Sequence, residues 1–569
     1  MSATLMPVAE RQAAICKRFA RWTPLTLHSA LDQAVMTFGE RPFVITDERT
    51  WTYREMADWS RRLAAGLAAH GVAPGDKVAL VIGNHPEFVA LKYAIARLGA
   101  VAVPINILNR RDELRYVLEQ SDSALLVTMD SFREVDYLAA LDEIAPDWES
   151  GGGGSALPRL RRIVVFPAGE AKLRSGALTF ADLERPANPR IDAINVDPQD
   201  DCDIIYTSGT TGSPKGVQLT HDMLTRTAFG SAYARAFEDG RRIIFSLPMF
   251  HVFGYVEGLL AAPWVGGAIV PQLRFEADRT LAAIERHRAS DALMVPAMTL
   301  ALLDEAQLRT YDLSSWHAVL ASGGRAPERL WRAVRESLAV DEITTGYGMT
   351  ETTASTTVTR PDDPIERLLS TNGRLRDVGP AGENWPGNRL VEYRVVDPGT
   401  GAVLAAGETG ELQAKGAGVT RGYYNKPEAT AAAMTDDGWL HTGDLGRIDD
   451  DGYVTLLGRT KESYRCGGEQ VLPTEIEDLL TTHPDVMQAQ VVPIPDERMG
   501  EVGVAFIVPR PGASLDPEAM RTMVATRLAR FKVPRHVLVI AETDIPTTAS
   551  GRARKFLLAQ KAQEMLGIA

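Results

Sequence analysis

Short apolar runs of strand character alternate with helical patterns through most of this chain. Residues 77–82 read Lys-Val-Ala-Leu-Val-Ile, which is typical of a buried strand. Asn84-His85-Pro86 then favours the start of a helix, because proline fixes φ and is tolerated in a first turn. Another apolar run follows at residues 99–104. Alternation of this kind implies parallel sheets covered by helices, so we expect an α/β fold.

The length and the turn signals divide the chain. At roughly 100 to 200 residues per domain, 569 residues are enough for several cores. Turn residues fill 449–453 in an antiparallel-looking segment, and a new helix is expected to open at Pro473. We therefore predict an N-terminal domain over residues 1–460 and a small domain over residues 461–569. A glycine-rich run at 149–155 is interpreted as a surface loop in preference to a lid.

Charge and cysteine content restrict the partners and the compartment. The chain has 61 basic and 74 acidic residues, a net charge of -13, which disfavours nucleic acid and anionic membranes as partners. Cys16, Cys202 and Cys466 lack metal-ligand spacing and suggest no disulfide framework. No apolar run reaches the roughly 20 residues that span a bilayer, and the N-terminus lacks a secretory pattern. We expect a cytoplasmic protein without a transmembrane segment.

The most informative motif occupies residues 206–216, which read Tyr-Thr-Ser-Gly-Thr-Thr-Gly-Ser-Pro-Lys-Gly. It follows the apolar pair Ile204-Ile205 and is predicted to leave a strand. Glycines permit close backbone approach, hydroxyls and N–H groups bind phosphate oxygens, and Lys215 adds positive charge. The motif is not a Walker P-loop, because Pro214 precedes the lysine and no Ser or Thr follows it.

With this motif the chain resembles the AMP-forming acyl-CoA synthetase family, within the adenylate-forming enzymes that include luciferases and peptide-synthetase adenylation domains. Further matches occur in the family's order along almost the whole chain. The resemblance implies a large N-terminal domain of α/β subdomains with a small β-rich part, followed by a small mobile α+β C-terminal domain. It assigns to the phosphate loop Thr207, Ser208, Gly209, Thr210, Thr211, Gly212 and Lys215.

Two later motifs complete the nucleotide site that the resemblance implies. In residues 347–351, Tyr347 and Gly348 would lie against adenine, Thr350 would touch phosphate, and Glu351 would help to hold Mg²⁺. In Thr442-Gly443-Asp444, the aspartate would bind the ribose hydroxyls, and Arg459 would accompany it.

Other matches concern the acyl group and the small domain. Ser322-Gly323-Gly324 would line the adenine and acyl pockets, and residues 248–251 would wall the carboxylate site with His251. By the same resemblance Lys461 is the hinge, while Gly467-Gly468 lines the pantetheine channel or forms only a turn. Cys466 is interpreted as structural or incidental.

Two residues depart from the family pattern. Arg552 stands where the family has its adenylation lysine, and a planar, forked guanidinium is not a conservative replacement at a tight site. Lys555, three residues on, is not assumed to substitute for it. Arg325 follows Gly323-Gly324, where a small residue is usual; it would pair with a polar substrate group or, as we favour, with solvent or a nearby acid such as Glu328.

The implied activity is ATP-dependent activation of a carboxylic acid, fatty or ring-bearing, as acyl-AMP, followed by transfer to coenzyme A. The acid is already ionised at neutral pH, and two like charges about 4 Å apart repel by roughly 4 kcal/mol at an effective dielectric constant of 20. Catalysis should therefore consist of charge neutralisation and positioning. The candidate catalytic residues are Lys215, His251, Thr350, Glu351 and Arg552.

Two alternatives stay open at this point. The acyl group could instead be delivered to an acyl carrier protein or an amine. Arg552 also allows a nucleotide-binding protein that has lost catalysis and serves regulation.

Overall fold

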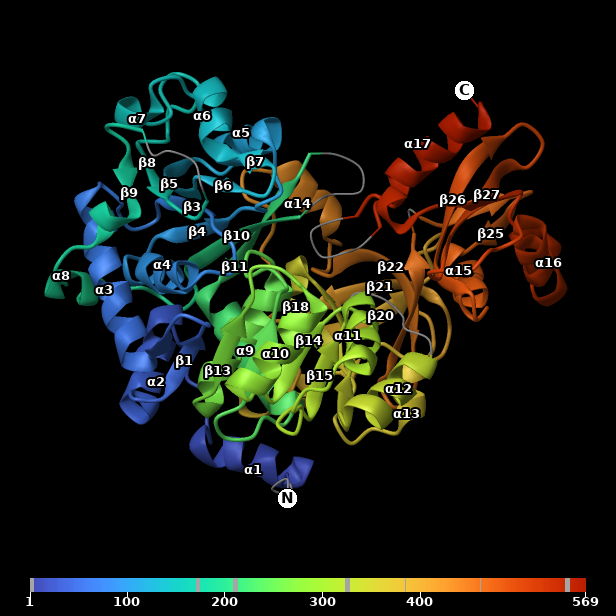
Figure 1. The fold of residues 1–569 in the computed structure, drawn as a ribbon, viewed down its shortest axis with the longest axis horizontal. Helices are drawn as coiled ribbons and strands as arrows, with labels where there is room; N and C mark the ends of the chain where they lie inside the picture. The colour runs from blue at the N-terminus through green and yellow to red at the C-terminus, as the bar shows by residue number, and fades with distance from the viewer. Residues whose placement is uncertain are drawn as a thin grey trace.

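The computed structural model describes residues 5–169, 174–207, 213–322, 328–383, 385–460, 462–547 and 553–568. Two seven-stranded sheets form the centre of its large N-terminal domain (Figure 1). The first sheet has the strand order β16 (Glu342–Thr344), β15 (Ala318–Ala321), β14 (Asp291–Met294), β12 (Arg242–Phe245), β13 (Ala268–Pro271), β1 (Pro42–Ile45) and β2 (Thr50–Thr52). The second has the order β11 (Lys215–Thr220), β10 (Asp201–Thr207), β4 (Val101–Pro104), β3 (Lys77–Val81), β5 (Ser123–Met129), β8 (Arg162–Phe166) and β9 (Leu178–Thr179).

Both sheets are parallel except at one edge, as the alternating pattern predicted. Only the pairs β1–β2 and β10–β11 are antiparallel among the described ladders of these sheets. Parallel neighbours need crossover connections, which helices supply here. The helix expected after β3 is α4 (Pro86–Arg97), with Pro86 in its first turn. Together with α9 (His221–Ala234), α4 is buried along almost its whole length and belongs to the largest apolar cluster.

A small β-rich part follows the parallel sheets. Its four-stranded antiparallel sheet is β20 (Glu392–Val396), β21 (Gly410–Lys415), β22 (Leu440–Ile448) and β23 (Val454–Arg459). The turn expected at 449–453 joins β22 to β23, and Gly452 there has φ 82°. A three-stranded sheet of β17 (Gly346–Met349), β18 (Ala354–Val358) and β19 (Arg374–Leu375) lies between this part and the parallel sheets in sequence.

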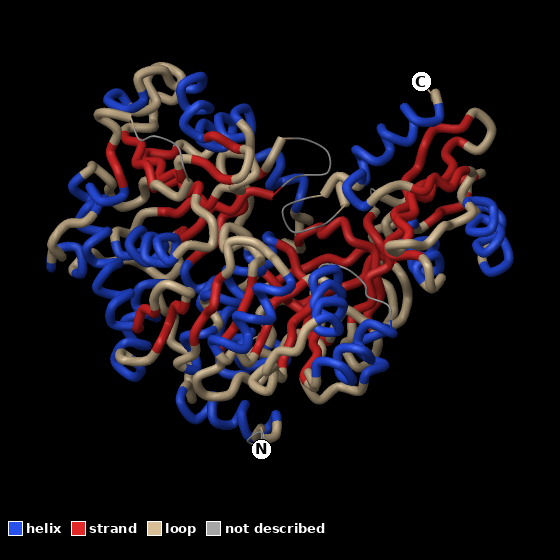
Figure 2. Tube along the Cα trace, viewed as in Figure 1, coloured by secondary structure: helices blue, strands red, loops and turns tan. Residues whose placement is uncertain are grey.

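The C-terminal domain has an apolar cluster of its own, whose buried members run from Tyr464 to Ala562. The domain combines helices α15 (Pro473–Thr481), α16 (Pro517–Arg527) and α17 (Lys555–Leu566) with strands β24 (Tyr464–Cys466), β25 (Glu469–Val471), β26 (Val486–Asp496), β27 (Gly500–Pro509) and β28 (His536–Val539). It projects from one side of the molecule (Figures 1 and 2). The predicted α+β character is confirmed. The boundary at residue 460 stays a prediction, and Lys461 lies outside the described residues.

Two further expectations concern loops and membranes. In the glycine-rich run Gly152 and Gly153 are buried, and a Cβ on Gly153 would lie 2.3 Å from the Leu157 carbonyl oxygen. Glycine is therefore needed there for packing rather than for flexibility. In the part of the chain that the structure describes, none of the helices combines the length and the apolar character needed to cross a membrane.

Candidate active site

The phosphate-loop motif connects the two strands of an edge hairpin. Thr207 at the end of β10 pairs with Lys215 at the start of β11. The motif thus leaves a strand, as expected, while Ser208, Gly209, Thr210, Thr211 and Gly212 lie outside the described residues. Gly216 is fixed by packing, because a Cβ there would lie 2.6 Å from Ile204 Cγ2.

Tyr423 joins the lysine of this hairpin to the acid of the second motif. The Lys215 Nζ lies 4.7 Å from the centroid of the Tyr423 ring, a cation–π contact. The hydroxyl of Tyr423 donates to Glu351 Oε1 at 3.0 Å. Burial raises the pKa of Glu351, although the Tyr423 hydrogen bond acts against that rise. The sequence reasoning missed Tyr423; its signal was an aromatic residue after a glycine, Gly422, whose φ is 143°.

Close approach of two strands explains the glycine of the second motif. Gly348 on β17 pairs with Ser355 on β18, and a Cβ on Gly348 would lie 1.8 Å from the Ala354 carbonyl oxygen. Thr350 and Glu351 follow in the short 3-10 helix η4 (Thr350–Thr352), and both are buried. The motif is therefore a tight hairpin that presents its polar residues at one end.

Asp444 brings the expected adenine and ribose residues together. Tyr347 Oη donates to Asp444 Oδ2 at 2.7 Å, although the two residues are 97 positions apart. Arg459 is the strand partner of Asp444 across β22–β23, and its Nε lies 2.8 Å from Asp444 Oδ1. Burial and the neighbouring Asp444 carboxylate raise the pKa of Tyr347 well above its usual range, so its hydroxyl keeps its proton and donates.

The segment at residues 248–251 is held by Asn84. The buried Asn84 side chain donates to Leu247 O at 3.0 Å and accepts from Met249 N at 2.8 Å. Asn84 was identified from the sequence only as part of a helix start. The π-helix η2 (Phe253–Leu259) follows directly, and a π-helix is a rare element that is frequent at functional sites.

His251 is a neutral imidazole with a defined tautomer. Burial lowers its pKa to about 4. Phe253 N donates to His251 Nδ1 at 3.2 Å, so Nδ1 has no proton and Nε2 carries it. His251 thus offers one N–H donor at neutral pH.

Ser322, which precedes the glycine pair expected to line the acyl pocket, is bonded to the start of the second motif. Its hydroxyl donates to Gly346 O at 2.7 Å, which joins the end of β15 to the start of β17. Gly323, Gly324 and Arg325 lie outside the described residues.

Of the small-domain site residues, the structure describes Gly467 and Gly468, and neither has a neighbour in this group within 4 Å of an added Cβ. Gly467 and Gly468, with φ of 62° and 89°, form the exposed two-residue turn of the β24–β25 hairpin. Burial raises the pKa of the neighbouring Cys466 thiol, which fits a structural residue. Arg552 lies outside the described residues.

Lys555 is engaged within the small domain itself. Its Nζ lies 2.7 Å from Glu477 Oε1 and 3.6 Å from Glu462 Oε2. Lys555 is thus paired with two acids, and its exclusion from the task of the family lysine stays a prediction.

The parallel sheets, the phosphate-loop hairpin and the Tyr347–Asp444 pair together define a nucleotide-binding α/β enzyme with a small C-terminal domain. Residues 31–424 match the family model described as AMP-binding enzyme, and residues 475–552 match that of the AMP-binding enzyme C-terminal domain. The chain belongs to the AMP-forming acyl-CoA synthetase family. It is an AMP-forming acid–CoA ligase, which activates an acid as acyl-AMP and ligates it to coenzyme A.

Three similar proteins illustrate the breadth of the family. A propanoyl:CoA ligase of Mycobacterium tuberculosis, whose named acyl group carries a methyl-dioxo-octahydro-indene ring system, is 33% identical over 93% of this chain and 97% of its own. The 4-coumarate–CoA ligase CCL1 of Humulus lupulus is 32% identical over 95% and 94%. A crystal structure of the anthranilate CoA ligase AuaEII with anthranoyl-AMP has a TM-score of 0.82 and 25% identity, covering 99% of this chain and 100% of that one.

Proposed function

We propose that this enzyme adenylates a carboxylic acid with an apolar body, fatty or ring-bearing, and transfers the acyl group to coenzyme A. The observation that carries the proposal is the contact series from Lys215 through Tyr423 to Glu351, near the Tyr347–Asp444 pair. The names of the indene-type, coumarate and anthranilate ligases support a ring-bearing acid.

The first half-reaction depends on charge neutralisation. One oxygen of the ionised acid forms a bond to the α-phosphorus of ATP, and the bond from that phosphorus to pyrophosphate breaks. Lys215 and the hydroxyl-rich loop offset the triphosphate charge, and Thr350 touches a phosphate oxygen. The neutral His251 donates its Nε2–H to the acid carboxylate and orients it. No general base is needed, since the acid has already lost its proton.

Tyr347, Asp444 and Arg459 hold the nucleoside. Tyr347 contributes a ring face to adenine, and Gly348 permits the close approach. Asp444 keeps accepting capacity for the ribose hydroxyls, because each carboxylate oxygen has two lone pairs and Tyr347 donates to Oδ2 alone.

Glu351 fits a magnesium ion. It is a buried carboxylate, and Tyr423 is the one side-chain donor to it among the described residues. Mg²⁺ is commonly bound by one or two carboxylates together with substrate phosphates, and when bound it would neutralise phosphate charge. Tyr423 fixes the orientation of the Glu351 carboxylate for that task.

For the second half-reaction we assign roles to the small domain. The coenzyme A thiol releases its proton to water, its sulfur bonds to the acyl carbon, and the bond from that carbon to the AMP oxygen breaks, so that AMP leaves. Rotation about Lys461 would bring Gly467 and Gly468 to the pantetheine arm and move Arg552 away. Arg552 would serve as the cation of the first half-reaction.

Acid-dependent ATP–pyrophosphate exchange over a broad carboxylate panel tests the proposal, with Arg552→Lys and Arg552→Ala as comparison variants. We expect exchange by the natural protein that is lost in the alanine variant, and the preferred acid then identifies the substrate class. Absence of exchange with every acid, despite ATP binding and rescue by lysine, would contradict the proposal and favour a regulatory nucleotide-binding protein.

A further inference from the structure

A fully buried carboxylate lies in the π-helix that follows His251. Glu257 has no exposed surface, and its side chain accepts hydrogen bonds from three elements. Ser355 N donates to its Oε1 at 3.1 Å, and the Ser231 hydroxyl of α9 donates to its Oε2 at 2.5 Å. Arg376 Nη2 lies 2.8 Å and 3.1 Å from the two oxygens. The four contacts satisfy the charge that burial would otherwise penalise.

These contacts join the two halves of the candidate active site. Ser355 lies on β18, the partner strand of β17, four residues after Glu351. Arg376 is tied to the same strand by its own N–H, which donates to Thr356 O at 2.9 Å. Glu257 itself lies six residues after His251. The Glu257 carboxylate therefore bonds η2, which follows the segment at residues 248–251, to β18, the strand paired with β17 of the second motif.

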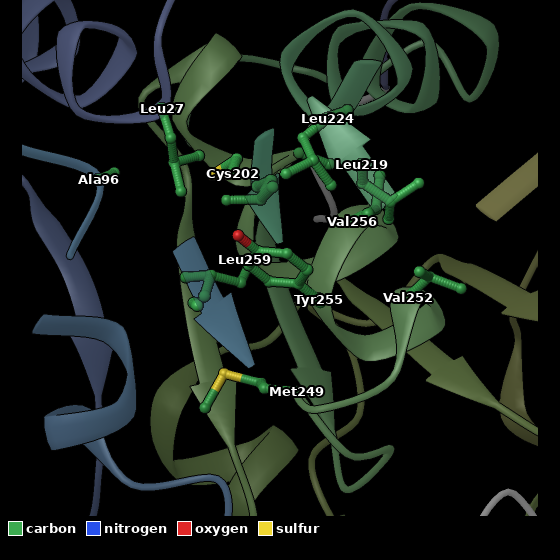
Figure 3. Close-up of a cluster of buried hydrophobic side chains, with 14 of the residues drawn as sticks. Leu27, Ala96, Cys202, Leu219, Leu224, Met249, Val252, Tyr255, Val256 and Leu259 are labelled. Carbon is green, nitrogen blue, oxygen red and sulfur yellow. The ribbon is translucent and has the colours of Figure 1, made fainter. Parts of the chain in front are cut away.

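Asn84 holds the residues before η2, and Tyr255 Oη donates to Asp203 Oδ2 at 3.1 Å. The remaining apolar side chains of this stretch pack by apolar contacts. Met249, Val252, Tyr255, Val256 and Leu259 lie in a cluster of buried hydrophobic side chains (Figure 3). Such contacts are non-directional, and they set the register of two elements less sharply than hydrogen bonds do. Glu257 supplies a bond with a defined direction between η2 and β18.

A buried ion pair is weak evidence for stability by itself. Replacing both partners by apolar side chains of similar volume is often neutral for stability. The Ser355 N–H bond is different, because a strand amide has a fixed position. We infer that Glu257 is a positioning residue, whose acceptor oxygen on Ser355 N sets the place of His251 relative to Glu351. This inference rests on the proposed function of those two residues.

Two double variants separate positioning from stability. Glu257→Gln with Arg376→Met removes both charges and keeps an oxygen that accepts from Ser355 N. Glu257→Met with Arg376→Met removes the same charges and the acceptor. The two double variants differ in the acceptor at position 257, which bonds Ser355 N on β18 and the Ser231 hydroxyl on α9.

We expect the glutamine double variant to keep kcat for acid-dependent exchange within about threefold of the natural protein. The methionine double variant should lose about 10-fold or more in kcat, because small misplacements of reacting groups are costly. Its Kd for ATP should change by less than about twofold, since the nucleotide residues stay bonded to one another. Equal kcat in the two double variants would overturn the inference.

Hydrogen exchange at the Ser355 amide provides a readout that needs no substrate acid. Protection of the Ser355 amide should persist in the glutamine double variant and fall in the methionine double variant. Because this readout needs no ligase activity, a failure of the proposed function is distinguishable from a failure of positioning. The single variant Glu257→Asp retains the charge and withdraws the oxygens by one methylene. If the double variants do not fold, Glu257→Asp should show the loss of amide protection and of kcat that is expected of the methionine double variant. Natural protection and natural kcat in Glu257→Asp would also overturn the inference.

Discussion

Tyr423 contacts two of the charged residues that the sequence suggested for catalysis, Lys215 and Glu351. Its ring faces the Lys215 ammonium, and its hydroxyl donates to Glu351. One side chain thereby fixes a cation and an anion that come from different motifs. The distance between them is set by a rigid aromatic ring rather than by a flexible ion pair.

Replacing Tyr423 by phenylalanine keeps the ring and removes the donor to Glu351. A hydrogen bond to a buried charge is worth about 1.5–3 kcal/mol, so exchange activity should fall by about tenfold or more. The measurement is acid-dependent ATP–pyrophosphate exchange at saturating ATP. Tyr424→Phe is the matched control, because the Tyr424 hydroxyl donates to Asp122 instead. Equal activity of the two variants would contradict the role of Tyr423.

The pKa of His251 predicts its behaviour with pH. Because burial lowers that pKa to about 4, the imidazole should stay neutral between pH 6 and pH 8 and give no inflection in activity there. In the unfolded chain the His251 imidazole takes up a proton below about pH 6.5, whereas in the folded state it does so only near pH 4. His251 therefore lowers the stability of the fold as the pH falls from about 6.5 towards 4. NMR titration of the imidazole signals, with His251→Asn for assignment, checks this. A midpoint near 6.5 would refute it.

At the scale of elements, the edge hairpins place the polar motifs. The β10–β11 hairpin brings Lys215 to the end of a parallel sheet, and β17–β18 presents Glu351 from a tight antiparallel pair. Segment 420–424 lies along β11, where Gln218 N donates to Gly422 O at 3.1 Å. Three elements that are remote in sequence therefore meet at one edge.

Gly348→Ala tests the tightness of the β17–β18 pair. The added Cβ would lie 1.8 Å from the Ala354 carbonyl oxygen, so the strands must separate and Tyr347 must leave Asp444. Overpacking typically destabilises by about 1–3 kcal/mol, and we expect ATP binding to be lost as well. Gly151→Ala is the control, since a Cβ there meets no atom within 4 Å. Thermal unfolding measures the stability of the two variants, and nucleotide titration measures their ATP binding. Unaltered ATP binding in Gly348→Ala would contradict the prediction.

At the scale of the whole molecule, buried ions link layers that are distant in sequence. Arg235 and Arg241 both form ion pairs with Asp291. Arg241 Nη2 also lies 3.2 Å from Glu342 Oε2. Glu342 pairs in turn with Arg11 of α1 (Val8–Arg18). Arg235 Nη1 donates to the Glu257 carbonyl oxygen at 3.3 Å. This series of contacts connects the N-terminal helix to the π-helix beside the candidate active site.

The small domain has a buried ion pair between Lys555 and Glu477, and this pair predicts pH-dependent stability. Burial raises the pKa of Glu477, and Lys555 opposes that rise. Lys555→Met should cost on the order of 3 kcal/mol at pH 8, because it leaves a buried charge with one cation fewer. The cost should be smaller at pH 5 than at pH 8, because the raised pKa of Glu477 favours proton uptake by the folded state as the pH falls.

Hydrogen exchange in α15 and α17 of the full chain measures this effect at the two pH values. Lys561→Met on the same helix is the control, because its pair with Asp544 is largely exposed and should contribute less than about 1 kcal/mol. A loss of stability in Lys555→Met that is equal at pH 5 and pH 8 would contradict the assignment of the effect to Glu477.

Much of this protein was determined by short stretches of sequence. The alternation of apolar runs predicted the parallel sheets, Pro86 predicted the start of α4, and Pro473 predicted the start of α15. The expected turn at 449–453 is also present. These features depend on φ preferences, side-chain periodicity and turn chemistry, which act within about ten residues and are therefore readable in the order of the residues.

The contacts that make the candidate active site were decided by the tertiary structure. Tyr347 and Asp444, Tyr423 and Glu351, and Glu257 and Arg376 are separated by 97, 72 and 119 positions. No local preference relates such residues, because each pair forms only when whole elements pack and bring their ends together. The sequence alone determined which elements form and predicted which motifs carry the chemistry, whereas packing decided which side chains hold those motifs in place.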